Sequence, residues 1–176
     1  MNEDCPPLLA LALQELRRDP LVVYLSAGQQ QDYLAGALAI GREQGKRCRG
    51  RRVKLLVEEL GARYVVRSEE GLIAGSAVFA EYDSDARLIT VYQPAIASVV
   101  RLLGISGQRG EAEGGALDLL LAHELFHHLE ATQIVPTPLQ LPPVSVPILG
   151  GLLKSPRRLR CTSEIAAHAF AHAVVG

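Results

Sequence analysis

Histidines are concentrated in the C-terminal third of this 176-residue chain, and three of the five lie in the segment LAHELFHHLE, residues 121–130. This segment contains the pattern H-E-x-x-H. Residues i and i+4 share one face of an α-helix, so His123 and His127 can both reach one metal ion about 2 Å from their ring nitrogens. Glu124 lies at the edge of that face, where its carboxylate can take a proton from a metal-activated water and pass it to a leaving amine. The pattern therefore fits a zinc site that hydrolyses peptide bonds, and the alternative is a helix that carries a polar stripe without a metal.

A catalytic zinc site needs a third protein ligand, and the candidates downstream are few. Glu164 is the only acidic residue after the motif segment, and it lies in the expected last helix, residues 162–175. Glu164, His168 and His172 are spaced i, i+4 and i+8, which places one polar stripe on a helix otherwise rich in Ala and Val. A metal and its surroundings would satisfy such a stripe if it is buried, and the alternative is a stripe that faces solvent. Cys161 could also approach the metal, although a small buried residue is its commoner role.

The two motif helices resemble those of a known enzyme family. HELFHHLE, followed about 35 residues later by EIAAHAFA, resembles the gluzincin metallopeptidases, and in particular the ImmA/IrrE family, with its H-E-L-G-H and later E-x-x-A-N-x-F-A helices. The strand expected near residues 88–92 is similar to the edge strand of those proteins. The resemblance covers about residues 60–175 and is specific at the two motif helices. It implies an α+β, zincin-like fold.

The resemblance also implies roles for individual residues. His123, His127 and Glu164 would bind Zn2+, and Glu124 would be the general base. His168 stands where the family has Asn, so it would steady a ligand histidine.

Three positions near these residues carry further expectations. Phe126 replaces the usual Gly of the family and would narrow the space beside the metal. His172, or a tyrosine such as Tyr92, could stabilise the oxyanion. The family's helix-turn-helix unit is not evident in this chain.

Other polar residues near the motif have plainer expected roles. His128 lies one residue past the ligand face, so we expect it to be exposed or to support the ligands. Glu130 could pair with a nearby base or cap the end of the helix. The basic run of residues 42–54 lacks interleaved aromatics and lies beside Glu58 and Glu59, which favours a solvated face over a nucleic-acid site.

The elements that position these residues follow from periodicity and turn signals. Apolar spacing predicts helices from Pro6-Pro7 to Asp19-Pro20, and then over residues 30–40, 53–60, 95–103, 116–131 and 162–175. Between the second and the third of these, Gly45 and Gly50 should break any helix over residues 41–52. Period-two runs at residues 62–67, 75–82 and 87–92 predict an antiparallel meander, and residues 21–25 fit a short strand or a helical turn. Residues 104–115 are expected to form a Gly-rich loop, and the Pro-rich residues 136–156 an ordered loop or lid. We expect one domain over residues 1–176, with a helical part in residues 1–60 and the meander and catalytic helices in residues 61–176.

Composition limits the alternatives. Apolar residues make up 48% and charged residues 21%, which excludes a disordered tail or a fibrous repeat. Eighteen basic against nineteen acidic residues give a net charge of −1, more acidic than is usual for a protein that binds phosphates. Three cysteines are too few for a disulfide framework, and no export signal or membrane-spanning run is evident. We expect a cytoplasmic protein.

The leading hypothesis is a zinc metallopeptidase that acts on peptides or proteins, with the substrate paired along an exposed edge strand. The Pro-rich segment would form a wall or lid of the cleft, and a homodimer or a regulatory protein partner could complete the groove. Two alternatives remain open. One is a metal-binding regulatory module without turnover, and the other is a nucleic-acid binder that uses the basic run.

Overall fold

The computed structural model contains helices and short strands, and it describes residues 6–73, 76–104 and 109–176. The protein is of the α+β class. Its elements, in chain order, are α1 (Pro6–Arg18), the 3-10 helix η1 (Pro20–Tyr24), α2 (Ala27–Cys48), α3 (Val53–Glu59), β1 (Arg63–Arg67), β2 (Gly71–Ile73), β3 (Ser76–Val78), β4 (Ala80–Asp83), β5 (Leu88–Tyr92), α4 (Gln93–Leu103), α5 (Arg109–Thr132), α6 (Thr137–Gln140), β6 (Val144–Ile148), the 3-10 helix η2 (Leu149–Gly151), β7 (Leu153–Arg157) and α7 (Cys161–Val175).

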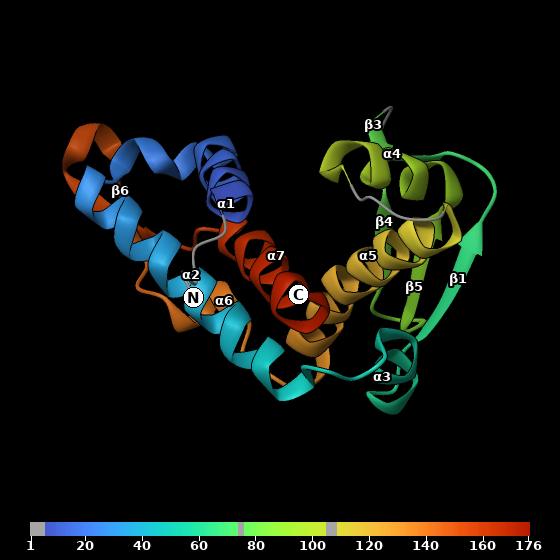
Figure 1. Ribbon diagram of the computed structural model, residues 1–176. Helices are drawn as coiled ribbons and strands as arrows, with labels where there is room; N and C mark the ends of the chain where they lie inside the picture. The colour runs from blue at the N-terminus through green and yellow to red at the C-terminus, as the bar shows by residue number, and fades with distance from the viewer. Residues whose placement is uncertain (1–5, 74–75, 105–108) are drawn as a thin grey trace.

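Two lobes diverge from the C-terminal helix (Figure 1). The N-terminal lobe contains α1, η1, α2 and the β6–β7 hairpin, and the sheet lobe contains α3, the strands β1–β5 and α4, with α5 running between α7 and the sheet. Each lobe has its own apolar cluster, and α7 contributes to both. Ile165 and Ala169 pack into the N-terminal lobe, whereas Phe170 and Val174 pack into the sheet lobe. Because α7 is apolar on both of these sides, it is buried between the lobes.

Close contact between α2 and α7 explains two glycines. Helix α2 continues through both Gly41 and Gly45 to Cys48, so the expectation that Gly45 breaks it is wrong. A Cβ at Gly41 would overlap the backbone oxygen of Ala166, and one at Gly45 would lie 2.9 Å from the backbone oxygen of Phe170. These glycines cost helix propensity, about 1 kcal/mol each, and permit the two backbones to approach. They are packing residues of a continuous helix.

The sheet differs from the expected antiparallel meander. Its order is β1-β5-β4, with β1 parallel to β5 and β4 antiparallel to β5. Strands β2 and β3 form a separate antiparallel hairpin, so the run expected over residues 75–82 is divided between two sheets. Alternation with period two is the same in parallel and antiparallel strands, and therefore could not reveal the direction of β1. Strand β5 is central, so the expected similarity of residues 88–92 to an edge strand is wrong, and β1 and β4 lie at the edges of this sheet.

The motif helix is longer than expected. Helix α5 begins at Arg109, so the Gly-rich loop expected over residues 104–115 is wrong from that residue onward, and residues 105–108 lie outside the described part. Ala112 and Ala116 are buried, and this packing outweighs the low helix propensity of the glycines between and beside them. Glu111 lies in the first turn, where an acidic side chain favours the helix dipole.

The Pro-rich segment contains regular structure. Residues 144–148 and 153–157 form the antiparallel hairpin β6–β7, and α6 precedes it, so the expectation of an irregular loop over residues 136–156 is wrong. Pro147 pairs with Lys154, and Pro156 pairs with Ser145. Both prolines therefore occupy the same class of pair, in which the backbone N–H would point away from the partner strand. A two-stranded hairpin tolerates proline at such positions. Residues 20–24 form η1, which agrees with the expected helical turn.

Candidate metal centre

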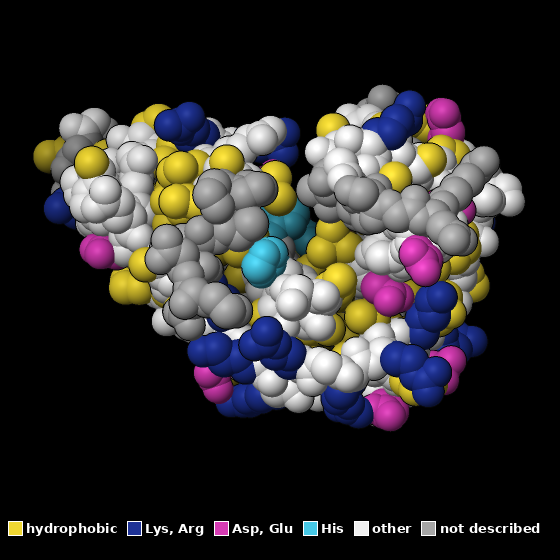
Figure 2. Space-filling view, viewed as in Figure 1, with side chains coloured by type: hydrophobic (Ala, Val, Ile, Leu, Met, Phe, Trp, Pro, Cys, Tyr) yellow, Lys and Arg dark blue, Asp and Glu magenta, His cyan; other side chains and the backbone are white. Residues whose placement is uncertain are grey.

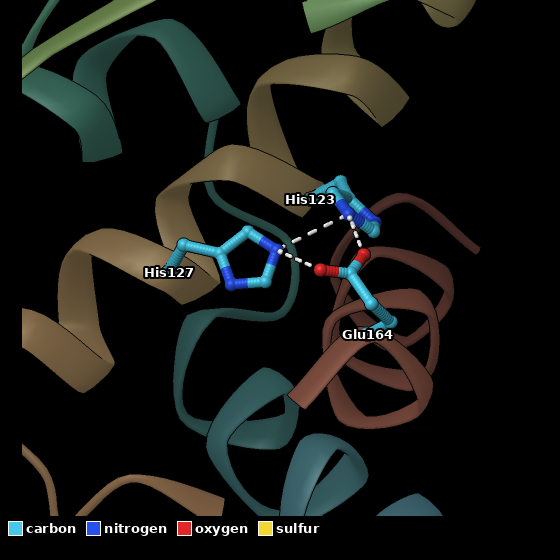
Figure 3. Close-up of side chains that lie close together, drawn as sticks. All are labelled: His123, His127 and Glu164. Carbon is cyan, nitrogen blue, oxygen red and sulfur yellow. Dashed lines mark hydrogen bonds and ion pairs between the residues drawn. The ribbon is translucent and has the colours of Figure 1, made fainter. Parts of the chain in front are cut away.

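The crossing of α5 and α7 brings together the three residues proposed as metal ligands. His123 and His127 lie one turn apart on α5, and Glu164 lies in the first turn of α7 (Figure 3). The two Nε2 atoms are 3.3 Å apart. Nε2 of His123 lies 3.2 Å from Oε2 of Glu164, and Nε2 of His127 lies 3.4 Å from Oε1 of the same carboxylate. Two histidines and one glutamate therefore form a possible metal site.

The donor set and its spacing fit a zinc ion. Zinc takes His nitrogens and carboxylate oxygens at about 2.0–2.1 Å in tetrahedral geometry, which places neighbouring ligand atoms about 3.3–3.4 Å apart. The Nε2 atoms of His123 and His127 are 3.3 Å apart, and they lie 3.2 and 3.4 Å, respectively, from different oxygens of the Glu164 carboxylate. Three protein ligands also leave one tetrahedral position open. Two nitrogens and an anionic carboxylate suit zinc better than the harder cations, which prefer sites made of oxygen alone.

Strong charge interactions hold the three side chains together. Burial disfavours a charge on His127, but the carboxylates of Glu130 and Glu164 outweigh that effect and raise the pKa of His127 to about 10. Hydrogen bonds from His123 and His127 lower the pKa of Glu164 well below its usual range, although burial opposes this shift. The protein alone therefore holds a proton where a metal cation would bind, and metal binding must displace it.

Glu124 is buried next to the site. Glu124 is a charged residue in the interior of the protein, and 8% of its surface is exposed. Burial raises the pKa of its carboxyl, and the neighbouring His123 and His127 reduce that rise. A carboxyl group with a raised pKa can both accept and return a proton near neutral pH.

Of the two further histidines on α7, only His168 adjoins the ligands. Its ring centroid lies 4.6 Å from that of His123. Burial and the charge of His123 together lower the pKa of His168 to about 3, so the ring is neutral. His172 is exposed, and none of the contacts among the described residues joins it to the ligands. The hydroxyl of Tyr92 donates to Oε1 of Glu81 at 2.6 Å, so it is already engaged.

His128 is a structural residue. It is fully buried, which contradicts the expectation of an exposed side chain. Its Nε2 donates to the backbone oxygen of Leu60 at 2.9 Å, and its Nδ1 accepts from the hydroxyl of Tyr82 at 2.8 Å. Both partners come from elements far away in the sequence, so no local pattern could have identified this role. His128 thereby joins α5 to β4 and to the loop after α3.

Phe126 belongs to the core. The side chain is fully buried and its ring packs against Phe170, with centroids 5.5 Å apart. It also meets the ring of His127 edge-on, with centroids 6.4 Å apart. Where the family has Gly, this chain therefore has an apolar support for a ligand helix.

The surface is hollowed between the two lobes, and histidine side chains are visible there, one group deeper in the hollow and one nearer the surface (Figure 2). Of the basic run, Arg47 pairs with Glu43, and Arg51 pairs with Glu59. Acidic side chains also lie among the more numerous basic ones along the lower edge of the molecule in Figure 2. This mixture of signs agrees with a solvated face.

No protein-family model, curated protein or solved structure matches this chain. The resemblance to gluzincins therefore rests on the motif residues and on the geometry of the triad. Within the described residues, none of the helices is long and apolar enough to span a bilayer.

Proposed function

We propose that this protein is a zinc-dependent metallopeptidase of the gluzincin type. The observation that carries the proposal is the convergence of His123, His127 and Glu164, whose ligand atoms lie within 4.8 Å of one another, with the two Nε2 atoms 3.3 Å apart. The buried carboxyl of Glu124 beside them supports it, because a purely structural zinc site has no need of a titratable group with a raised pKa. A zinc ion bound there would supply a Lewis acid that polarises a peptide carbonyl and acidifies a water molecule.

Glu124 and His168 are assigned different tasks in this reaction. Glu124 accepts a proton from the attacking water and returns it to the nitrogen of the leaving amine, which its raised pKa favours. His168, neutral and adjacent to His123, can donate a hydrogen bond to the developing oxyanion. The engaged hydroxyl of Tyr92 and the exposed position of His172 make these two residues weaker candidates for that task.

Strand β4 supports an extended peptide as substrate. It is an edge of the three-stranded sheet among the described strands, and it contacts α5. The backbone N–H of Tyr92 donates to the oxygen of Phe79, so alternation directs the backbone groups of Ala80 and Tyr82 to the open side. A substrate strand can pair there without selecting for particular side chains.

Glu124→Gln tests the proposal. In zinc-loaded protein, this isosteric change should lower peptide hydrolysis by about 10²–10⁴-fold and leave zinc content unchanged, because only the proton acceptor is removed. Glu111→Gln, an exposed position on the same helix, serves as the control and should retain activity. The assay is cleavage of a broad peptide library followed by mass spectrometry. Undiminished cleavage by Glu124→Gln, or no cleavage by the zinc-loaded wild-type protein, would contradict the proposal.

A further inference from the structure

Glu130 lies behind the metal-binding face of His127. It follows His127 by three residues on α5, so both side chains occupy the same side of the helix. Its side chain is only 9% exposed, and Oε2 lies 3.7 Å from Nδ1 of His127, within the range of an ion pair. Nε2, the other ring nitrogen of His127, faces His123 and Glu164. The imidazole of His127 is therefore held between two carboxylates.

The same carboxylate also contacts the helix that carries the third ligand. The hydroxyl of Ser163 donates a hydrogen bond to Oε2 of Glu130. Ser163 immediately precedes Glu164 at the start of α7. One oxygen of Glu130 thus lies near Nδ1 of His127 and accepts from the neighbour of Glu164, which links the two helices at the point where they present their ligands.

The other oxygen of Glu130 is occupied as well. Oε1 accepts the backbone N–H of Thr137 at 2.6 Å, at the start of α6. Ser163 and Thr137 therefore donate to the two oxygens of Glu130, and Nδ1 of His127 lies close to one of them. A buried carboxylate that keeps its charge needs such partners. These contacts hold the side chain in one orientation.

We infer that Glu130 is a positioning residue for the metal centre, so that the functional pattern of α5 is H-E-x-x-H-x-x-E, completed by Ser163-Glu164 on α7. A carboxylate at Nδ1 keeps the proton of His127 on that nitrogen and leaves the lone pair of Nε2 for the metal. Through Ser163 it also fixes the helix turn that presents Glu164. The inference rests on the proposed metal site, and it assigns a role that neither the motif nor its resemblance contains.

A competing role for Glu130 is purely structural, as the anchor of α6 through Thr137. Glu130→Gln separates the two roles, because the amide oxygen of Gln can still accept from the Thr137 N–H but has no negative charge for His127. The structural role alone predicts metal binding like that of the wild-type protein. The positioning role predicts zinc and Co2+ affinities about 10–100-fold weaker.

The experiment measures zinc and Co2+ affinity by competition with a chromophoric chelator and records the visible spectrum of bound Co2+. Glu130→Gln should weaken both affinities and change the Co2+ spectrum, which reports ligand geometry and which a change in α6 alone would not alter. Glu111→Gln, on the same helix and exposed, should match the wild-type protein in both measurements. Circular dichroism checks that each variant is folded.

Ser163 provides a second test that leaves the charge of Glu130 and its contact with Thr137 in place. Ser163→Ala should weaken binding by a smaller factor than Glu130→Gln, and Ser163→Thr, which keeps a hydroxyl, should restore it. If Glu130→Gln does not fold, this pair of variants carries the test. Wild-type affinity and an unchanged Co2+ spectrum in Glu130→Gln, or in Ser163→Ala where Glu130→Gln is unfolded, would overturn the inference and leave the metal site intact. Failure of the wild-type protein to bind either metal would overturn both.

Discussion

His127 and His128 are neighbours in the sequence, yet they lie in opposite environments. His128 is fully buried, and both of its nitrogens have neutral partners, the hydroxyl of Tyr82 and the backbone oxygen of Leu60. His127 lies among charged groups instead, with Glu130 near Nδ1 and Glu164 near Nε2, and a second imidazole 3.3 Å away.

The difference separates a structural histidine from a proposed metal ligand. Neutral partners on both nitrogens satisfy His128 completely, so it can fix the helix against the sheet and has no capacity left for a metal. His127 and His123 direct their Nε2 atoms at one point that they share with a carboxylate, which without a cation requires a proton to be held there. Convergence of two imidazole nitrogens and a carboxylate identifies the site, and the presence of histidine alone does not.

The largest effect expected from this contrast is on metal affinity. His127→Ala should weaken zinc binding by more than the roughly 100-fold that loss of an outer partner can cause, because it removes a ligand. Competition with a chromophoric chelator measures the change. His128→Ala is the matched variant and should bind zinc with the stoichiometry of the wild-type protein. Equal losses of zinc affinity in His127→Ala and His128→Ala would contradict the assignment of His127 as a ligand and of His128 as a structural residue.

Folding stability should depend more on His128 than on His127. His128→Ala removes a fully buried ring and leaves the Leu60 oxygen and the Tyr82 hydroxyl without their partner, which should lower the free energy of unfolding by about 3 kcal/mol. Urea unfolding of the metal-free protein measures it. Tyr82→Phe removes only one hydrogen bond and should cost about 1 kcal/mol. A stability change near zero for His128→Ala would remove the structural role assigned to His128.

The smallest of these effects is the pH dependence of metal binding. Because the pKa of His127 is raised to about 10 in the metal-free protein, the ring holds a proton at neutral pH, and zinc must displace it. Zinc affinity should therefore rise about tenfold for each pH unit between pH 7 and 9, as one proton is released per metal bound. Titrations of the wild-type protein at several pH values measure the slope. An affinity that stays constant over this range would contradict a proton held at the ligand site.

The local part of the site could be predicted from the sequence. Helical spacing is sufficient to place His123 and His127 on one face, because residues four apart are neighbours on any α-helix. Glu164 lies about 40 residues away, and spacing alone left His168, His172 and Cys161 as alternatives. The structure brings Glu164 to the histidine pair and leaves His172 exposed.

The parts that could not be predicted depend on contacts between distant elements. The environment of His128 comes from Leu60 and Tyr82, and the direction of β1 comes from its pairing with β5. From the sequence alone Gly45 is expected to break a helix. Its packing role follows only from the backbone of α7, which lies too close to leave room for a Cβ at this position. No sequence pattern around Ser163 indicates its role, because that role depends on the position of Glu130 on another helix.

The most direct test of the account is the metal content of the purified protein, wild type beside Glu164→Ala, determined by mass spectrometry. The geometry predicts about one zinc per chain in the wild-type protein and a loss of most of it in the variant, with Glu111→Ala as an exposed control that keeps its zinc. Zinc that survives Glu164→Ala would contradict the assignment of the third ligand. No metal in the wild-type protein, even after zinc is supplied, would contradict the metal centre itself.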